Sequence, residues 1–300
     1  MNVLSLFNGI SCGRVVLEKA QIEVDNYYSS EIDKDAMLIA DKNYPQDVKN
    51  KLGDVTEWKN WNLPKIDLIL AGSPCQGFSR IGNGLNFEHK QSKLFFEFIN
   101  ILNWIKENNN PNVKFLLENV KMKQEWIEVI NDYIGIKGKL INSNLFSAQN
   151  RERYYWTNIE YIQNINDKEI YIDDIIEKQK VEEGHYCKEH QLLHADVCRE
   201  VSCKWSKGTP IYDFYNKSIK YGKSNTVVPH CFRRDRSAPN IIKDDYGLRR
   251  FTEIECERLQ GLPDNYTNVK GVSCGNRYKA IGNGWNIDTI VHIIKELKIN

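Results

Sequence analysis

The chain has 300 residues, of which 41% are hydrophobic and 27% charged, and its formal net charge is +1. Its length allows one large domain or two smaller ones with a sizeable core. Because no basic-plus-apolar leader and no run of about 18 apolar residues occurs, the sequence argues against a secreted or membrane-spanning protein. We therefore expect a cytoplasmic protein without a membrane partner, whose eight cysteines are reduced thiols.

Charge is unevenly distributed in the second half of the chain. Residues 160–200 contain eleven acidic and five basic side chains, whereas residues 204–250 contain eleven basic and four acidic ones. A basic segment of this kind is typical of a phosphate-binding surface, and a solvated face is an equally good interpretation from charge alone.

Short apolar runs alternate with helix-length segments over the first 120 residues. We expect parallel strands at 3–7, 25–30, 66–71 and 113–118. The alternation predicts an α/β fold with a doubly wound, Rossmann-like sheet. Ligands of such sheets bind beyond the carboxyl ends of the strands.

Polar motifs follow the first two expected strand ends, and a third motif, GDV, precedes the strand expected at 66–71. FNGISCG, at 7–13, is a glycine turn without the GxGxxG pattern, which favours a smaller adenosine ligand over a nicotinamide dinucleotide, although such turns are often only turns. Glu31 lies 22 residues beyond Gly9, where a carboxylate reaches ribose hydroxyls. Asp54, in GDV, is placed to accept a hydrogen bond from an adenine amino group.

Cys75 stands in GSPCQGFSRIG, at 72–82, directly after an apolar run. A packing residue, a disulfide half, a metal ligand and a nucleophile are the four interpretations of this cysteine, and the disulfide is disfavoured by the reduced compartment. If the strands at 66–71 and 113–118 are neighbours, Cys75 and Glu118 face one cleft. The ordinary interpretation of Glu118 is a solvated or helix-capping carboxylate.

QNRER, at 149–153, places Arg151 and Arg153 on one face of an extended segment. Two adjacent guanidinium groups favour recognition of a phosphate or carboxylate, while exposed charges on an edge strand are the plainer interpretation.

The segment from about 160 to 248 lacks the strand–helix alternation and is expected to form a smaller, irregular region. Within it, Cys187, His190, His194 and Cys198 recur at helical spacing. Eleven residues of helix rise about 16 Å, too far for four ligands to meet on one zinc ion. We expect a half-buried helix face and no metal site.

A helix is predicted within RRFTEIECERLQGLP, at 249–263. Thr252 and Glu255 form a capping box, Phe251 and Cys256 a hydrophobic staple, and Gly261 a stop signal. A glycine-rich turn and an amphipathic helix end the chain.

In this order the motifs resemble the cytosine-5 DNA methyltransferases, most closely their compact phage and bacterial members and the catalytic domains of animal de novo enzymes. The similar motifs are FNGISCG, EID, GDV, GSPCQGFS, ENV, QNRER, RRFTEIECERLQGLP and GNGW. The matches run from residue 3 to about 290 and leave 160–248, where the family holds its target-recognition region. The chain departs from the family pattern at Ser11-Cys12-Gly13, where more glycine is usual, and at Gly284, where serine is common.

The resemblance implies an enzyme of a bacterial or phage-infected cell that uses S-adenosylmethionine. Its partner would be double-stranded DNA, and the resemblance also allows a cognate restriction endonuclease as a partner. It divides the chain into a catalytic domain, 1–158 with 278–300, and a small target-recognition domain, 159–277. Its catalytic residues would be Cys75, which attacks C6 of a flipped cytosine, Glu118, which donates a proton to ring N3, and Arg151 and Arg153, which hold Glu118, the base or a nearby phosphate.

The remaining site residues follow from the same motifs. The expected cofactor contacts are Phe7, Asn8, Gly9, Ile10, Cys12, Glu31, Ile32, Asp54, Val55, Ser73, Pro74, Asn283, Gly284 and Trp285. The expected nucleic-acid contacts are Gln76, Ser79, Arg80, Lys223, Ser224, Asn225, Thr226, Arg233, Arg234 and Arg236. GFSRIG keeps an RNA cytosine methyltransferase as second hypothesis, and a non-catalytic DNA-binding relative is the third.

Overall fold

The computed structural model describes residues 1–73, 92–161, 163–187, 208–213, 218–229, 231 and 240–297. Internal packing divides the chain into unit 1, residues 1–142, 152–163 and 289–300, and unit 2, residues 143–151 and 164–288. These units differ from the boundaries expected above, because 143–151 and 278–288 pack with unit 2 and 159–163 with unit 1. The side chains of Gln149 and Arg151, which bond to the backbone of unit 2, account for the first difference.

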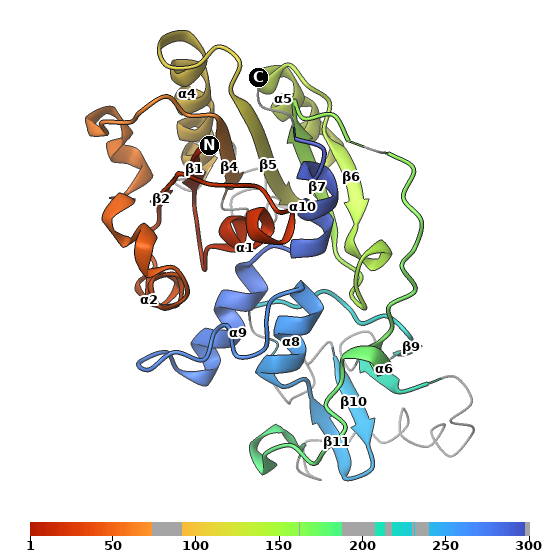
Figure 1. The fold of residues 1–300 in the computed structure, drawn as a ribbon. Coiled ribbons are helices and arrows are strands. Elements are labelled where there is room, and N and C mark those ends of the chain that lie inside the picture. The colour runs from red at the N-terminus through yellow and green to blue at the C-terminus, as the bar shows by residue number, and fades with distance from the viewer. Residues whose placement is uncertain are drawn as a thin grey trace. The chain divides into compact units, whose positions relative to one another are not determined.

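Unit 1 is built on a seven-stranded sheet with the order β3-β2-β1-β4-β5-β7-β6 (Figure 1). Its strands are β1 (Asn2–Leu6), β2 (Asn26–Ser30), β3 (Lys51–Gly53), β4 (Leu68–Gly72), β5 (Lys114–Val120), β6 (Lys139–Asn142) and β7 (Glu152–Thr157). The first five pair in parallel, and β7 is antiparallel to both β5 and β6. The four predicted strands and the α/β class are therefore confirmed, with a mixed rather than wholly parallel sheet.

Helices cover both faces of this sheet, which is why its central strands are continuous apolar runs. Helices α4 (Ser92–Asn108) and α5 (Gln124–Ile134) pack through Phe95, Phe98 and Ile130 on one face. Figure 1 shows α1 (Cys12–Lys19) and α10 (Ile287–Ile294) on the nearer face. Between β2 and β4 run α2 (Lys34–Asn43) and the 3₁₀ turns η1 (Pro45–Asn50) and η2 (Val55–Asn60). None of the helices in the described part of the chain is long and apolar enough to cross a bilayer.

Unit 2 contains a four-stranded antiparallel sheet in the order β11-β10-β8-β9. The strands are β8 (Pro210–Asp213), β9 (Ser218–Tyr221), β10 (Ile241–Asp244) and β11 (Gly247–Arg250). The helical elements are η4 (Ser143–Leu145), α6 (Ile172–Ile175), η5 (Glu183–His185), α8 (Glu253–Gln260) and α9 (Cys274–Asn283). One apolar cluster, which includes Ile211, Ile242, Leu259 and Ile281, joins this sheet to α8 and α9.

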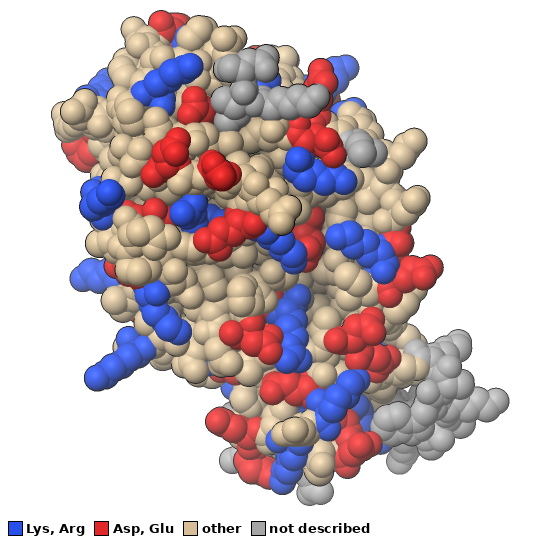
Figure 2. All heavy atoms as spheres, viewed as in Figure 1, with Lys and Arg blue, Asp and Glu red and all other residues tan. Residues whose placement is uncertain are grey.

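The basic segment at 204–250 is not a uniform basic surface among the described residues. Arg249 and Arg250 are buried, and the side chain of Lys223 is 13% exposed. Figure 2 shows acidic and basic side chains intermixed on the face seen in Figure 1. Outside the described residues lie Arg233, Arg234 and Arg236.

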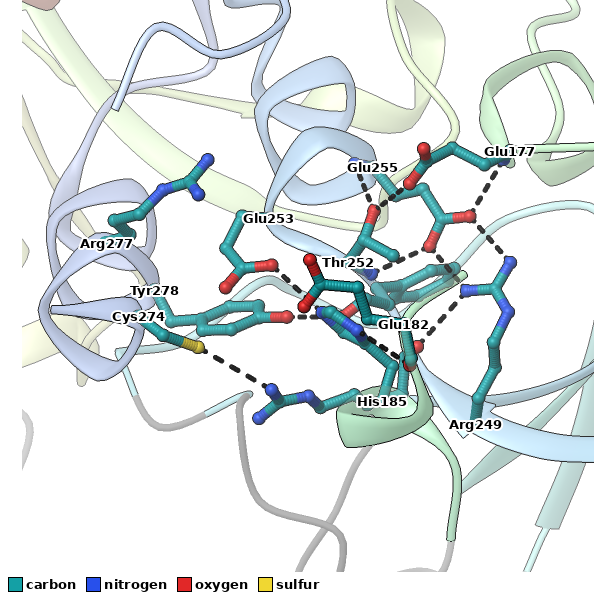
Figure 3. Close-up of polar contacts among 12 residues, drawn as sticks. Glu177, Glu182, His185, Arg249, Thr252, Glu253, Glu255, Cys274, Arg277 and Tyr278 are labelled. Atoms are coloured by element: carbon teal, nitrogen blue, oxygen red, sulfur yellow. Dashed lines mark hydrogen bonds and ion pairs between the residues drawn. The ribbon is translucent and has the colours of Figure 1, made fainter. Parts of the chain in front are cut away.

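Helix α8 begins at the predicted capping box. Thr252 Oγ1 accepts a hydrogen bond from the Glu255 amide at 3.1 Å, and Glu255 Oε2 accepts one from the Thr252 amide at 2.8 Å. Gly261 ends the helix with φ of 76°, as expected. Glu255 also receives two bonds of 2.8 Å from Arg249 (Figure 3). Both side chains are fully buried. Arg249 Nε also pairs with Asp244 Oδ2 at 2.6 Å, so Glu255 and Asp244 together compensate the buried Arg249 charge.

Glu255→Ala should lower the free energy of unfolding by about 3–5 kcal/mol, because it leaves the buried Arg249 without its bidentate partner. Urea denaturation of the two proteins would measure this difference. As a matched control in the same unit, Asp264→Asn breaks the part-exposed pair with Arg258 and should cost about 1 kcal/mol or less. Equal losses in the two variants would contradict the importance of the buried pair.

Candidate active site

The loop from β1 to α1 has an unusual backbone that leaves open space above it. Phe7, Gly9 and Ser11 have φ of 57°, 57° and 61°. A Cβ added at Gly9 would meet no atom within 4 Å, and glycine adopts this conformation without steric penalty. The Asn8 amide donates to the Ser30 carbonyl at 3.0 Å, which ties the loop to the end of β2. A ligand can therefore approach the backbone closely at Gly9.

Glu31, directly after β2, is held by three backbone amides. Its Oε2 accepts from Gly9 at 2.7 Å, and its Oε1 accepts from Ile32 and Asp33, each at 2.8 Å. A carboxylate has about four lone-pair positions, so Oε2 can still accept from a ligand hydroxyl. The side chain of Ile32 is 67% exposed beside it, which offers an apolar surface to a ring.

Asp54 follows β3 and caps η2. Its Oδ1 accepts from the Thr56 amide and from Thr56 Oγ1, both at 2.9 Å. Both bonds go to the same oxygen, so Oδ2 remains able to accept from an amino group. Val55 is 5% exposed, so its side chain belongs to the core and only its backbone can face a ligand.

These residues fit an adenosine-type ligand. The strands β3, β2 and β1 are parallel neighbours, so their carboxyl ends lie on one edge of the sheet. This edge therefore carries Glu31, Ile32, Asp54 and the loop at Gly9. Ile10 and Cys12, also expected to contact the cofactor, are 1% and 3% exposed, so any contact would use their backbone. The ligand set contains acceptors for hydroxyl and amino groups and no basic group for a pyrophosphate.

Glu118 lies at the carboxyl end of β5 and is 9% exposed. Arg153 of β7 places Nε 2.9 Å from Glu118 Oε1, so the guanidinium orients the carboxylate. Glu118 pairs in register with Gly72 of β4, three residues before Cys75. The adjacent Asn119 donates from Nδ2 to Ser73 Oγ at 2.9 Å, which ties the two strand ends together. The neighbouring strands expected from the sequence are thus present.

Several expected site residues lie outside the described part of the chain. These are Pro74, Cys75, Gln76, Ser79 and Arg80, together with the three arginines named above. Of the metal candidates, Cys187 is described, and its amide donates to the Leu248 carbonyl at 2.8 Å. His190, His194 and Cys198 lie outside.

Two of the described cysteines, Cys256 and Cys274, have thiols whose pKa is raised by burial. Cys12, Cys231 and Cys256 are buried, and burial raises the pKa of the Cys256 thiol well above its ordinary value. Cys274 is exposed, yet partial burial and a hydrogen bond to Glu253 raise its pKa too. Reactive cysteines need a depressed pKa and access.

The QNRER motif has a role in unit 2 that its sequence did not reveal. Arg151 is 3% exposed and donates to the carbonyl oxygens of Val227, Gly282 and Gly284 at 3.1, 3.3 and 2.8 Å. Arg151 therefore holds the backbone of the expected cofactor motif GNGW, whereas Arg153 holds Glu118. The expectation that both guanidinium groups point to the same acidic or phosphate group is corrected: the two have different partners.

Two glutamines complete this network and were missed by the sequence analysis. Gln149 donates to the Leu259 carbonyl at 3.1 Å and accepts from the Val227 amide at 2.8 Å. Gln260 donates to the Ile281 carbonyl at 2.9 Å. Both are fully buried. Their place in the QNRER and RLQG motifs was the only signal of importance.

The expected nucleic-acid segment SNTVV, at 224–228, is tightly held in unit 2. Lys223 Nζ contacts the carbonyls of Asn144 and Ser147 and Asp167 Oδ1 at 2.7, 3.4 and 3.1 Å, so its three donors are already engaged. Ser224 is buried, and Thr226 Oγ1 donates to the Asn150 carbonyl at 2.7 Å. Asn225 donates to Asp213 Oδ2 at 3.0 Å. These contacts indicate that Lys223, Ser224 and Asn225 hold the segment in shape.

GNGW, at 282–285, spans the carboxyl end of α9 in unit 2. Asn283 is exposed, while Gly284 is buried and Trp285 is 8% exposed. A Cβ added at Gly282 would lie 2.4 Å from both Val228 C and Pro229 N, so only glycine fits where the backbone of 228–229 crosses α9.

The strand order of unit 1, with the Glu118–Arg153 ion pair at the end of β5, defines a Rossmann-like methyltransferase fold. The chain is similar over 98% of its length to the crystal structure of an S. pombe Dnmt2 methyltransferase, with a TM-score of 0.73 and 21% identity over 97% of that chain. This likeness shows the fold.

The family model described as C-5 cytosine-specific DNA methylase matches residues 1–299. The chain belongs to this family, as its motif order predicts. Curated relatives include the Type II methyltransferase M1.ScrFI of Lactococcus lactis subsp. cremoris, 30% identical over 98% of this chain and 77% of the relative. Another is the Type II methyltransferase M.FnuDI of Fusobacterium nucleatum, 28% identical over 99% and 94%.

Gly282→Ala should destabilise the protein by about 1–3 kcal/mol, because the added methyl group would overlap the backbone of 228–229. Gly275→Ala, in the same helix, meets nothing within 4 Å and should stabilise by about 0.5–1 kcal/mol. Denaturation midpoints of the two variants would then move in opposite directions. A shared direction would contradict the close approach at Gly282.

Proposed function

We propose that this DNA cytosine-5 methyltransferase uses S-adenosylmethionine to methylate C5 of a cytosine flipped out of duplex DNA, through a covalent adduct on Cys75. The observation that carries the proposal is the Glu118–Arg153 pair of 2.9 Å at the end of β5, in register with Gly72 and hence next to the strand end that leads into Cys75. An oriented carboxyl group beside the strand end that precedes Cys75 in the sequence supports addition of the Cys75 thiolate to a pyrimidine ring.

Glu31, Ile32 and Asp54 would hold the adenosine part of S-adenosylmethionine, and the backbone at Gly9 would approach its amino-acid part. The fixed Glu31 carboxylate and the remaining oxygen of Asp54 support this assignment, because they are acceptors facing a donor-rich nucleoside. Phe7, Asn8, Ser73, Pro74, Asn283, Gly284 and Trp285 complete the proposed set. When bound, the cofactor supplies an electrophilic methyl carbon.

Cys75 supplies the electron pair that makes C5 reactive. Its thiolate adds to C6, forming the C6–S bond, while Glu118 delivers a proton to ring N3 and removes the negative charge that would develop there. C5 then becomes a nucleophile and would take the methyl group, while the electron pair of the broken carbon–sulfur bond stays on the sulfur of the departing S-adenosylhomocysteine. The C5 proton would pass to solvent, the N3 proton would return to Glu118, and cleavage of the C6–S bond would release the Cys75 thiolate and restore the aromatic ring.

Arg153 would keep Glu118 pointed at the base throughout this cycle. Arg151 would act at a distance, by holding the backbone at Gly282 and Gly284. Because neither C5 nor C6 is reachable on both faces in a stacked duplex, the base must leave the helix, which costs a few kcal/mol. Thr226 and the basic residues at 233, 234 and 236 are proposed to contact the DNA.

Duplex DNA is the favoured substrate over RNA, because the family model and the curated relatives are named for DNA or Type II methylation. Those names also support a place in restriction and modification in the cytoplasm of a bacterial or phage-infected cell, with a cognate endonuclease as partner. Methyl transfer to duplex DNA with none to folded RNA is the expected assay result.

Glu31→Ala should weaken S-adenosylmethionine binding by about 1–3 kcal/mol, because the ribose hydroxyls lose a charged acceptor. Isothermal titration calorimetry would measure the change. Asp35→Ala is a matched control, since Asp35 lies in the first turn of the following helix α2. Wild-type affinity in Glu31→Ala would remove Glu31 from the site.

DNA with 5-fluorocytosine at the target should trap the enzyme, because fluorine cannot leave as the C5 proton does. The denaturant-stable adduct should require S-adenosylmethionine, map to the peptide with Cys75, and disappear in Cys75→Ser, whose hydroxyl is far less nucleophilic. Cys274→Ser, which removes an exposed thiol, should trap normally. An adduct that survives Cys75→Ser would overturn the assignment.

A further inference from the structure

The loop of residues 7–11 holds two non-glycine residues, Phe7 and Ser11, in the left-handed backbone region. Residues other than glycine rarely adopt this backbone conformation, and they keep it only where surrounding contacts stabilise it. Ser11 is also the N-cap residue that precedes α1, yet its side chain does not cap the helix. Some other group must therefore stabilise its conformation.

Two buried side chains provide that contact. Asn8 Nδ2 donates to Ser11 Oγ at 2.8 Å, and the Tyr27 hydroxyl donates to Asn8 Oδ1 at 2.9 Å. All three side chains of this relay are buried, with exposed fractions of 4% at Ser11, 8% at Asn8 and 1% at Tyr27. The tyrosine sets which end of the Asn8 amide faces Ser11, since its hydroxyl engages the amide oxygen and leaves the NH₂ group for Ser11.

Tyr27 is well suited to this task because it is immobile and remains a donor. It belongs to β2, whose strand pairing with β1 fixes its distance from the loop. Burial raises the pKa of Tyr27 above its ordinary value, so the hydroxyl keeps its proton near neutral pH. Arg14 of α1 also lies over its ring, 5.9 Å from the centroid.

We propose that Tyr27 is a positioning residue for cofactor binding: through Asn8 it holds Ser11, and with it the loop, in the conformation that admits S-adenosylmethionine. The Tyr27 hydroxyl contacts the loop through its hydrogen bond to Asn8 Oδ1. The inference rests on the proposed function, because the loop is the proposed cofactor site.

Tyr27→Phe tests this role by removing one hydroxyl and keeping the ring. Both Kd and KM for S-adenosylmethionine should rise about five- to tenfold, the effect of one buried hydrogen bond. The kcat at saturating cofactor and the Kd for duplex DNA should change less than about twofold.

Tyr44→Phe is the matched control. Tyr44 is 7% exposed in the same unit, and its hydroxyl donates to Glu18 Oε2 at 3.1 Å rather than to the loop. Tyr44→Phe should keep wild-type cofactor affinity, while its loss of thermal stability should be similar to that of Tyr27→Phe. Equal weakening in the two variants would overturn the proposal, because it would indicate general loosening of unit 1.

A second variant tests the path through Ser11. Glycine adopts φ near 60° without a steric penalty, so Ser11→Gly added to Tyr27→Phe should restore cofactor affinity to within about twofold of wild type. Unchanged affinity in Tyr27→Phe, or failure of this rescue, would overturn the inference. Wild-type protein that does not bind S-adenosylmethionine would instead overturn the proposed function.

Discussion

Parallel pairing of β1 with β2 and β4, and of β4 with β5, is the constraint on which the proposed site of unit 1 depends. Parallel strands end at the same edge of a sheet, so residues far apart in the sequence become neighbours there. This pairing sets the positions of Glu31 and Glu118. Each is then oriented by a different kind of donor, backbone amides for Glu31 and a guanidinium for Glu118.

In unit 2 the corresponding constraint is that buried backbone polar groups need partners. The carbonyls of Leu259 and Ile281 lie in the last turns of α8 and α9, and the backbone at 227 and 284 lies outside helices and strands; at all four positions, side-chain amides or one guanidinium supply hydrogen bonds. Three family motifs, QNRER, RLQG and GNGW, meet in this network. Close approach of the backbone at Gly282 shows how tightly the parts are packed.

The arginines of QNRER illustrate how two adjacent charges take different tasks. Arg153 is paired with a carboxylate, where its charge and its direction both matter. Arg151 donates to three carbonyl oxygens, where five donors in a planar fork can serve several acceptors. A lysine, with a single ammonium group, would not span these acceptors in the same way.

Local patterns were readable from the sequence. The apolar runs predicted β1, β2, β4 and β5, and the spacing of Thr252, Glu255 and Gly261 predicted where α8 begins and ends, because these signals depend on residues within a few positions of one another. The order of the motifs identified the family and, with it, the reaction. Their chemistry also suggested the acceptors Glu31 and Asp54 for an adenosine ligand.

Only the tertiary structure decided the partners of long polar side chains. Arg151 and Lys223 were expected at an acidic or phosphate ligand, but each is engaged by oxygens of unit 2, and the hydrogen bond from Tyr27 to Asn8 had no sequence signal at all. Gln149 and Gln260 are 111 residues apart, and Arg151 and Gly284 are 133 apart. Composition and spacing report what a side chain can bond to, whereas its partner is chosen by which unsatisfied group the packed backbone brings within about 3 Å.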